Sequence, residues 1–158
     1  MQTTTPTRPI TLSLREITFR REMLGWVGAT HFVLDPLSDD TDCVFAALRC
    51  TDTVRLRSGA LVPSPVFLVA PPGYFAPRYQ ICLDEPFADS LDLVVPEDTA
   101  LLAIITQRKP LDRSTVNLFS PIVVNRHTGI ADQFVPASSE AETGWRVRTP
   151  LPTSLAAD

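Results

Sequence analysis

The stretch Leu93–Val135, which reads LVVPEDTALLAIITQRKPLDRSTVNLFSPIVVNRHTGIADQFV, decides the fold. Within it, Leu101–Thr106 is a short apolar run rich in β-branched residues, which predicts a strand and is far too short to span a bilayer. After a polar turn, Thr115–Phe119 alternates apolar and polar residues, which predicts a second strand. Pro121 then interrupts the strand, because proline has no N–H to donate to a neighbouring strand.

Two further strands follow this interruption. Ile122–Val124 resumes the extended pattern, and Ile130–Val135 continues it after the turn Asn125–Gly129. Two short apolar runs joined by a polar, glycine-containing loop are typical of a β-hairpin. The stretch therefore predicts four strands in close succession.

The rest of the chain adds short strands separated by turns that the fifteen prolines mark. Further strands are expected within 10–19 (with an irregularity near residue 16), 31–34, 43–50, 66–70 and 78–83, and a hairpin arm within 53–65. Asp84–Asp92 is the best helix candidate, because Asp84 can cap the first turn and Pro86 suits its start. This pattern predicts an all-β, mainly antiparallel, barrel-like single domain with one or two short helices.

The expected domain limits follow from composition. The chain of 158 residues is long enough for one domain. We expect a disordered Thr- and Pro-rich tail at 1–9, the barrel domain at 10–151 and a C-terminal tail at 152–158. The start of the chain has no continuous apolar segment, which predicts neither a signal peptide nor a membrane anchor and favours the cytoplasm.

The charge of the chain limits its partners. The formal net charge is −4 and the isoelectric point is about 5.1. Binding along nucleic-acid phosphates requires clustered Lys and Arg, so a direct nucleic-acid surface is not expected. An acidic protein is better suited to a basic partner protein.

The sequence carries no pattern of an enzyme, a metal site or a cofactor site. His31 and His127 are the only histidines, and their spacing does not match a zinc site. Nucleotide-binding and nucleophile-elbow motifs are missing from the sequence. Cys43, Cys50 and Cys82 have no C-x-x-C spacing, so we expect three unpaired, buried thiols.

Three motifs give the chain a family resemblance. PEDTALLAIIT, TVNLFSPIVVN and ADQFV, in this order and spacing, resemble the core of the FliW family of flagellar assembly factors. The resemblance implies a cytosolic, monomeric adaptor without cofactor that binds flagellin and antagonises the translational regulator CsrA, a small basic RNA-binding dimer. Such an adaptor would couple the level of flagellin to its translation. The chain departs from the family's pattern at Thr53–Pro65, which is longer and more basic.

Two surfaces are candidates for partner binding, and each has a plainer alternative. The acidic group comprises Asp84, Glu85, Asp89 and Asp92. It could face the basic regulator or could simply be a solvated helix face. The second group comprises Asn117, Phe119, Pro121, Ile122 and Asn125. It could form an accessible sheet edge, or the asparagines could satisfy turn backbone while Ile122–Val124 lies in the core.

The alternative function is a small-ligand-binding β-barrel without catalytic activity. It predicts an internal cavity lined by Phe32, Phe45, Phe67 and Tyr79. An adaptor predicts instead that these four aromatic side chains fill a packed core.

Overall fold

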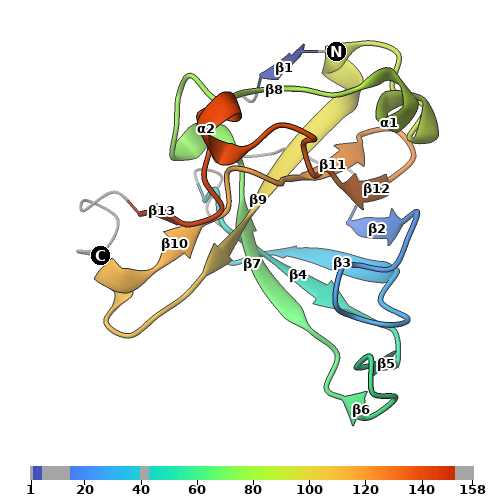
Figure 1. Cartoon of the computed structure of the whole chain (residues 1–158). Coiled ribbons are helices and arrows are strands. Elements are labelled where there is room, and N and C mark those ends of the chain that lie inside the picture. The colour runs from blue at the N-terminus through green and yellow to red at the C-terminus, as the bar shows by residue number, and fades with distance from the viewer. Residues whose placement is uncertain (1, 5–14, 40–42, 152–158) are drawn as a thin grey trace.

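Strands from both halves of the chain close a barrel in this computed structural model, which describes residues 2–4, 15–39 and 43–151 (Figure 1). Seven strands follow one another around it. In spatial order they are β11 (Ile122–Asn125), β12 (Ile130–Gln133), β2 (Glu16–Phe19), β3 (His31–Pro36), β4 (Ala46–Cys50), β7 (Val66–Ala70) and β9 (Thr99–Thr106). Strand β9 pairs back to β11, and this pairing closes the barrel. The predicted mainly-β barrel is confirmed.

One pair of barrel strands differs from the expected antiparallel arrangement. Strand β12 runs parallel to β2, with Ile130 opposite Thr18 and Ala131 opposite Phe19. The other barrel pairs are antiparallel. A parallel pair needs no tight turn between its strands, so a local hairpin signal cannot reveal it.

Shorter elements surround the barrel. The additional strands are β1 (Gln2–Thr4), β5 (Val54–Arg55), β6 (Leu61–Val62), β8 (Gln80–Cys82), β10 (Thr115–Val116) and β13 (Thr149–Pro150). The described residues hold two short α-helices, as predicted: α1 (Glu85–Ser90) and α2 (Glu140–Thr143). Three 3-10 turns are η1 (Pro72–Tyr74), η2 (Pro96–Asp98) and η3 (Leu111–Arg113).

The predicted tails are described only in part. Gln2–Thr4 forms β1 against β8, which differs from the disorder expected over 1–9. Residues 5–14, which include the start of the first expected strand, and the tail 152–158 lie outside the described residues. The domain limits therefore stay predictions.

The interruption at Pro121 is a bulge along one edge of β9. Strands β10 and β11 both pair with this edge, with Val116 opposite Ile105 and Ile122 opposite Leu102. Six positions on one side therefore match three on the other, which leaves three extra residues in the bulge. Such insertions bend a strand and re-aim its side chains.

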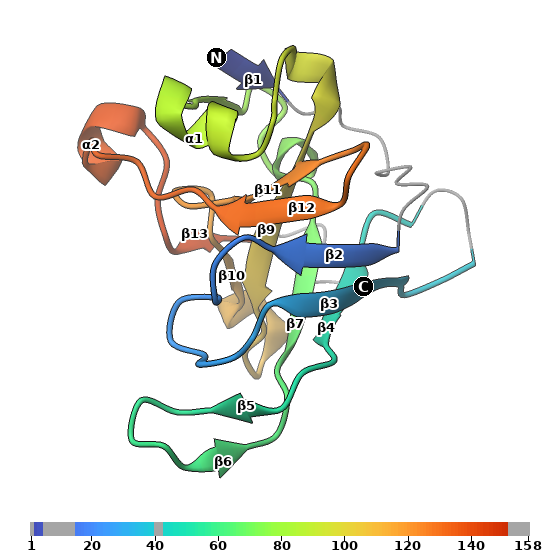
Figure 2. The ribbon, with the colours of Figure 1, turned by 90° about the vertical axis from the view of Figure 1, so that its right-hand side faces the viewer.

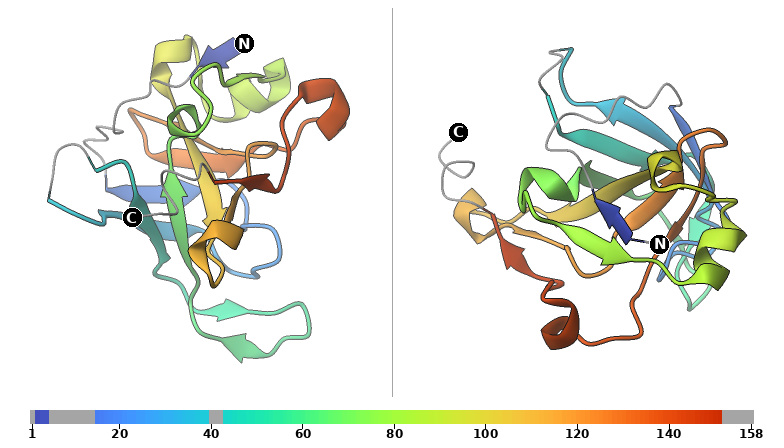
Figure 3. Two further views of the ribbon diagram at one scale, coloured as in Figure 1. Left: turned by 90° about the vertical axis from the view of Figure 1, so that its left-hand side faces the viewer. Right: turned by 90° about the horizontal axis from the view of Figure 1, so that it is seen from above.

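Strand β9 contributes to two hydrophobic cores because both of its faces are covered. Ala100 and Leu102 point into the barrel interior. Leu101, Ala103 and Ile105 point outward, where β8, α1 and the segment after β12 cover them (Figure 3, right). Burial on both faces explains why this strand is continuously apolar instead of alternating.

The four aromatic residues that could have lined a ligand cavity divide between these cores. Phe32 and Phe67 pack together in the barrel interior, with ring centroids 6.4 Å apart. Tyr79 and Phe45 belong to the outer core. The Tyr79 hydroxyl donates a 2.7 Å hydrogen bond to the Leu118 carbonyl, and burial raises the pKa of Tyr79 so that it stays a neutral donor. The four aromatic side chains therefore pack within the two cores, as expected for an adaptor.

The three cysteines are free, as predicted, but they are not all buried. Cys50 lies in the barrel interior, Cys43 is half-buried and Cys82 is exposed. Along β8 alternate side chains face inward, with Ile81 buried and Cys82 directed to solvent. The prediction of burial was therefore wrong for Cys82, because its position in the strand outweighs the usual preference of cysteine for the interior.

Candidate functional site

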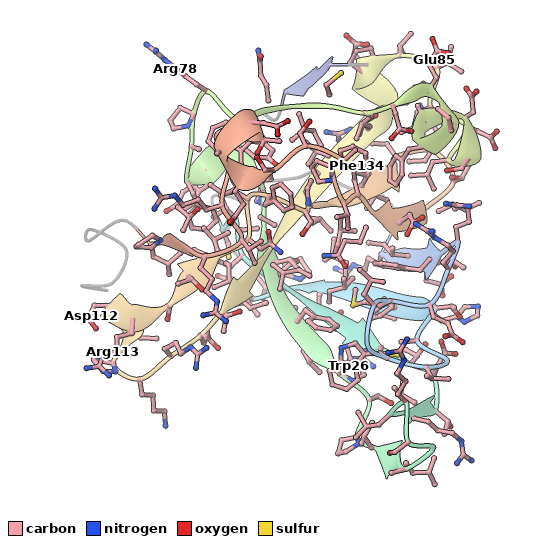
Figure 4. The ribbon with its side chains drawn as sticks, in the orientation of Figure 1. Trp26, Arg78, Glu85, Asp112, Arg113 and Phe134 are labelled. Carbon is pink, nitrogen blue, oxygen red and sulfur yellow. The ribbon has the colours of Figure 1, made fainter. Side chains whose placement is uncertain are left out.

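The four predicted acidic residues lie together around α1, as an exposed group that we call the acidic surface: Asp84, Glu85, Asp89 and Asp92. Asp84 starts the helix, because its carboxylate accepts a 2.8 Å hydrogen bond from the Phe87 backbone N–H. Glu85 points away from the protein (Figure 4). None of the four takes part in a salt bridge with any described residue. Their negative charge is therefore uncompensated within the described part of the chain.

Asn125 fixes the end of α1 and does not reach the surface. It is only 3% exposed, and its side-chain amide donates to the carbonyls of Leu91 at 2.8 Å and Asp92 at 3.4 Å. Its side-chain oxygen accepts from the backbone N–H groups of His127 and Thr128. This geometry matches the plainer alternative for Asn125, in which its side chain forms hydrogen bonds with backbone groups of the turn.

A second link joins the same turn to η2. The His127 Nε2 and Asp98 Oδ1 atoms lie 2.8 Å apart, and the Arg126 backbone N–H donates to the Asp98 carbonyl. Hydrogen bonds to the Asp98 carboxylate from the Val95 backbone, His127 and the Val94 backbone hold the pKa of Asp98 below its usual range. The turn after β11 thus holds both ends of the 91–98 segment that carries part of the acidic surface.

The second predicted group is mostly interior. Asn117 supports the bulge, because its side-chain oxygen accepts from the Phe119 and Ser120 backbone N–H groups at 3.1 and 3.0 Å. Pro121 and Ile122 are buried. Asn125 is buried as well, and a role of these three residues in partner binding stays a prediction. Phe119, which is half-buried, retains accessible area.

Two adjoining grooves link Asp84, one residue of the acidic surface, with Phe119. The first groove, of about 630 Å³, lies between α1, the segment 19–24 after β2, and the end of β12. The second, of about 450 Å³, lies between β8, the segment 134–138 and Trp145, and Phe119 lines it. Asp84 and Phe134 line both grooves, so the grooves meet at these two residues.

Sequence reasoning missed the cationic wall of the first groove. Arg20 and Arg21 both bind the Asp132 carboxylate, at 2.8 and 3.0 Å. The Asp132 side chain is almost fully buried, and its other oxygen accepts from the Gln133 backbone N–H. The available signal was a paired arginine directly after a predicted strand, together with an aspartate inside an apolar one. The first groove is therefore lined by Asp84 at the start of α1 and by Arg20 and Arg21 after β2.

Within residues 2–4, 15–39 and 43–151, no group of three or more His, Cys, Asp or Glu side chains could hold a metal ion. No helix in the same ranges has the length and apolar character needed to cross a membrane.

Comparisons with known proteins agree with one another. The model of the family described as "FliW protein" matches residues 2–151. The flagellar assembly factor FliW of Bacillus licheniformis is 34% identical over 119 residues, which cover 75% of this chain and 76% of the relative. That of Bacillus subtilis is 33% identical over 127 residues, or 80% and 81% of the two chains. A crystal structure of the flagellar assembly factor FliW superimposes with a TM-score of 0.67 at 25% identity, and covers 87% of this chain and 86% of that one.

Proposed function

The chain belongs to the FliW family of flagellar assembly factors, and on this basis we propose that it is a cytoplasmic, non-catalytic adaptor that binds flagellin and antagonises CsrA. The match spans all described residues, so the proposal concerns the whole barrel and not one motif. The adaptor would couple the amount of free flagellin to flagellin translation.

The uncompensated acidic surface is the observation that carries the proposal. Four exposed carboxylates without salt bridges in the described structure surround a helix of six residues. Charge complementarity with a basic protein such as CsrA would speed association and set orientation. The adjoining grooves supply apolar contact area beside these charges, through Phe87 and Phe134.

The regulation would follow from competition for a limited adaptor. Flagellin that has not been exported occupies the adaptor, and only adaptor without flagellin restrains CsrA. Each partner shifts the apparent affinity for the other by mass action, so no cofactor, nucleotide or covalent change is needed.

Calorimetric titration against flagellin and CsrA from the same organism tests the proposal. We expect both to bind, flagellin to displace CsrA, and the double variant Glu85→Lys/Asp89→Lys to lose at least about tenfold in CsrA affinity, mainly through slower association. Asp84 is left intact in this variant because it caps α1.

A matched control separates local charge from net charge. The variant Glu16→Lys/Asp112→Lys changes the net charge equally, at exposed positions outside α1. It should bind CsrA nearly as wild type does. If neither partner binds wild-type protein at tens of micromolar, the adaptor proposal is wrong. An equal loss in both double variants would argue against a localised acidic contact.

A further inference from the structure

Strand β8 has one open edge. It pairs with β1 on the other edge, where Thr3 lies opposite Ile81, and no other described strand pairs with it. In Figure 1 and in the view from above (Figure 3, right), β8 lies between β1 and the segment that carries α2. A sheet of two strands is only marginally stable by itself, so a third strand on the open edge would stabilise it.

One hydrogen bond shows where the backbone groups of β8 point. The Trp145 Nε1–H donates to the Gln80 carbonyl at 2.8 Å, and Trp145 follows α2, so this carbonyl points away from β1. In an antiparallel pair, every second residue directs its N–H and C=O groups to the partner strand, and the residues between direct theirs to the opposite edge. Ile81 therefore faces β1, whereas the backbone groups of Gln80 and Cys82 face the open edge.

The second groove runs along this open edge. Gln80 and Cys82 line it on the β8 side, and both are exposed. Apolar side chains form much of the remaining lining: Phe119, Phe134, Pro136 and Trp145. The Trp145 ring packs on that of Tyr79, with centroids 4.7 Å apart, so the barrel side of the groove supports this wall. Backbone donors beside an apolar wall form the arrangement that receives an extended peptide.

The charge of the groove is simple. Among the described residues that line it, Asp84 is the only one with an acidic or basic side chain. One oxygen of Asp84 caps α1, and the carboxylate forms no salt bridge with a described residue. A cationic side chain near that end of the groove would therefore be favoured.

We propose that the second groove binds an extended segment of a partner protein, which adds to β8 as a third strand. The segment would direct apolar side chains to the aromatic wall at every second position and place a lysine or arginine beside Asp84. Main-chain hydrogen bonds would provide affinity, and the alternate side chains would provide selectivity. This site goes beyond the proposed function, because it does not need the charges of Glu85 and Asp89.

Other occupants fit the groove less well. A helix has already used its backbone groups in internal hydrogen bonds, so it cannot pair with β8. A small apolar ligand would exclude water and leave the backbone N–H groups of Gln80 and Cys82 without a partner, which costs free energy. The carboxylate of Asp84 and the lack of a basic lining residue oppose a phosphate or another anion.

An NMR titration tests the site with an end-capped synthetic peptide, KVTVTVK, in which valine and threonine alternate between two lysines. We expect a Kd on the order of 100 µM, because a short flexible segment must become ordered on binding. The backbone amide signals of Gln80 and Cys82 and the indole signal of Trp145 should shift. Trp26, the only other tryptophan, packs against the barrel core and should keep its indole signal.

Methylated peptides show whether the segment adds as a strand. Only one edge of a bound strand faces β8. N-methylation of one set of amides, either the valines or the threonines, should therefore weaken binding at least about tenfold, and N-methylation of the other set should have little effect. If neither set matters, the groove recognises side chains alone and the proposal is overturned.

A change of peptide charge tests the contribution of Asp84. The peptide EVTVTVE should bind about two- to fivefold more weakly than KVTVTVK, because exposed charge pairs contribute little. Asp84→Asn, which can still cap α1, should reduce this difference. An unchanged difference in that variant would overturn the predicted contact between the cation and Asp84.

A filled groove gives the matched control. Ala137 is exposed and lines the groove, so Ala137→Phe should reduce the affinity for KVTVTVK at least about tenfold. Ala60→Phe places the same side chain on the exposed β5–β6 hairpin, at the opposite end of the molecule from α2 (Figure 2), and should bind as wild type does.

Three results would overturn the inference: no shifts at about 1 mM peptide, equal losses in both phenylalanine variants, or groove signals that change with protein concentration alone, which would indicate a second copy in the groove. The titration contains neither flagellin nor CsrA, so its failure would leave the proposed function standing.

Discussion

The side-chain amide of Asn125 donates a hydrogen bond of 2.8 Å to the carbonyl of Leu91, and this bond joins the turn after β11 to the end of α1. The acidic surface is therefore held in place by the barrel and not by the short helix alone. A helix of six residues cannot be stable by itself, so such ties determine where its charges lie.

Removal of this tie should destabilise the protein and loosen α1. Asn125→Ala leaves buried backbone groups without their partner and should lower the free energy of unfolding by about 2–3 kcal/mol in urea denaturation. Amide hydrogen exchange in α1 should become faster. Asn117 also supports a turn through its side-chain amide, but it is half-exposed and has no link to α1. Asn117→Ala should therefore cost only about 1 kcal/mol and leave α1 exchange unchanged. Equal exchange in both variants would contradict this role for Asn125.

Asp84 should combine a structural and a charge effect that two variants can separate. Asp84→Asn keeps an oxygen that can accept from the Phe87 backbone N–H, so its stability should match wild type within a few tenths of a kcal/mol. Asp84→Ala loses the cap and should cost about 1 kcal/mol in thermal or urea unfolding. Both variants should weaken CsrA binding similarly, because both remove the charge. A loss of affinity confined to the alanine variant would show that only the helix start matters.

Because β9 contributes to both cores, we expect substitution of either of its neighbouring leucines to lower the free energy of unfolding by a similar amount. Leu102→Ala removes packing from the barrel interior and Leu101→Ala from the outer core, and each should cost about 2–5 kcal/mol of unfolding free energy. Val94→Ala, at a position that is largely solvent-exposed, should change stability by less than about 0.5 kcal/mol. A negligible effect at Leu101 would mean that the outer face of β9 is not a packed core.

Local sequence predicts some features of this structure and not others. The strand around Leu101, the break at Pro121 and the cap at Asp84 depend on local chemistry, and the structure confirms all three. The parallel β12–β2 pair joins residues distant in sequence, so no local pattern reveals it. The burial of Asn125 results from packing against the end of α1, which its own local sequence does not reveal. The Arg20–Asp132 contact joins residues 112 positions apart, so no local pattern reveals it either.

Asp98 should make stability depend on acid pH. Its hydrogen bonds place its pKa in the folded state below the unfolded value of about 3.9, so its stabilising contribution is complete above that value and is lost as the pH falls through the folded pKa. Asp98→Asn should therefore be less stable than wild type at about pH 6, and the gap in urea midpoint should narrow toward about pH 2.5. If the difference in urea midpoint between wild type and Asp98→Asn stayed the same at all pH values, ionisation of Asp98 would not contribute to stability.

Gly28 should be far less tolerant of substitution than Gly59, although both have positive φ angles. A Cβ at Gly28 would lie 3.0 Å from the Thr53 carbonyl oxygen, where the loop meets the base of the arm, whereas nothing lies within 4 Å at Gly59. Both alanine variants should lose about 1 kcal/mol to backbone strain, and Gly28→Ala should lose at least about 1 kcal/mol more. Thermal unfolding of the two variants gives the comparison. Equal losses would show that the loop can shift away from Thr53.

The position of the closing strands bears on how the protein forms during its synthesis. Strand β2 leaves the ribosome early, yet its parallel partner β12 follows late, and the Arg20–Asp132 contact beside this pair spans 112 residues of sequence. Until the partner emerges, the inner side chains of β2, such as Ile17 and Phe19, have only part of their final cover. Pairing between such distant segments is slow because a long loop must close first. The newly made chain is therefore expected to pass through a state in which the inner face of β2 is only partly covered, and exposed apolar surface of this kind favours association between unfinished chains.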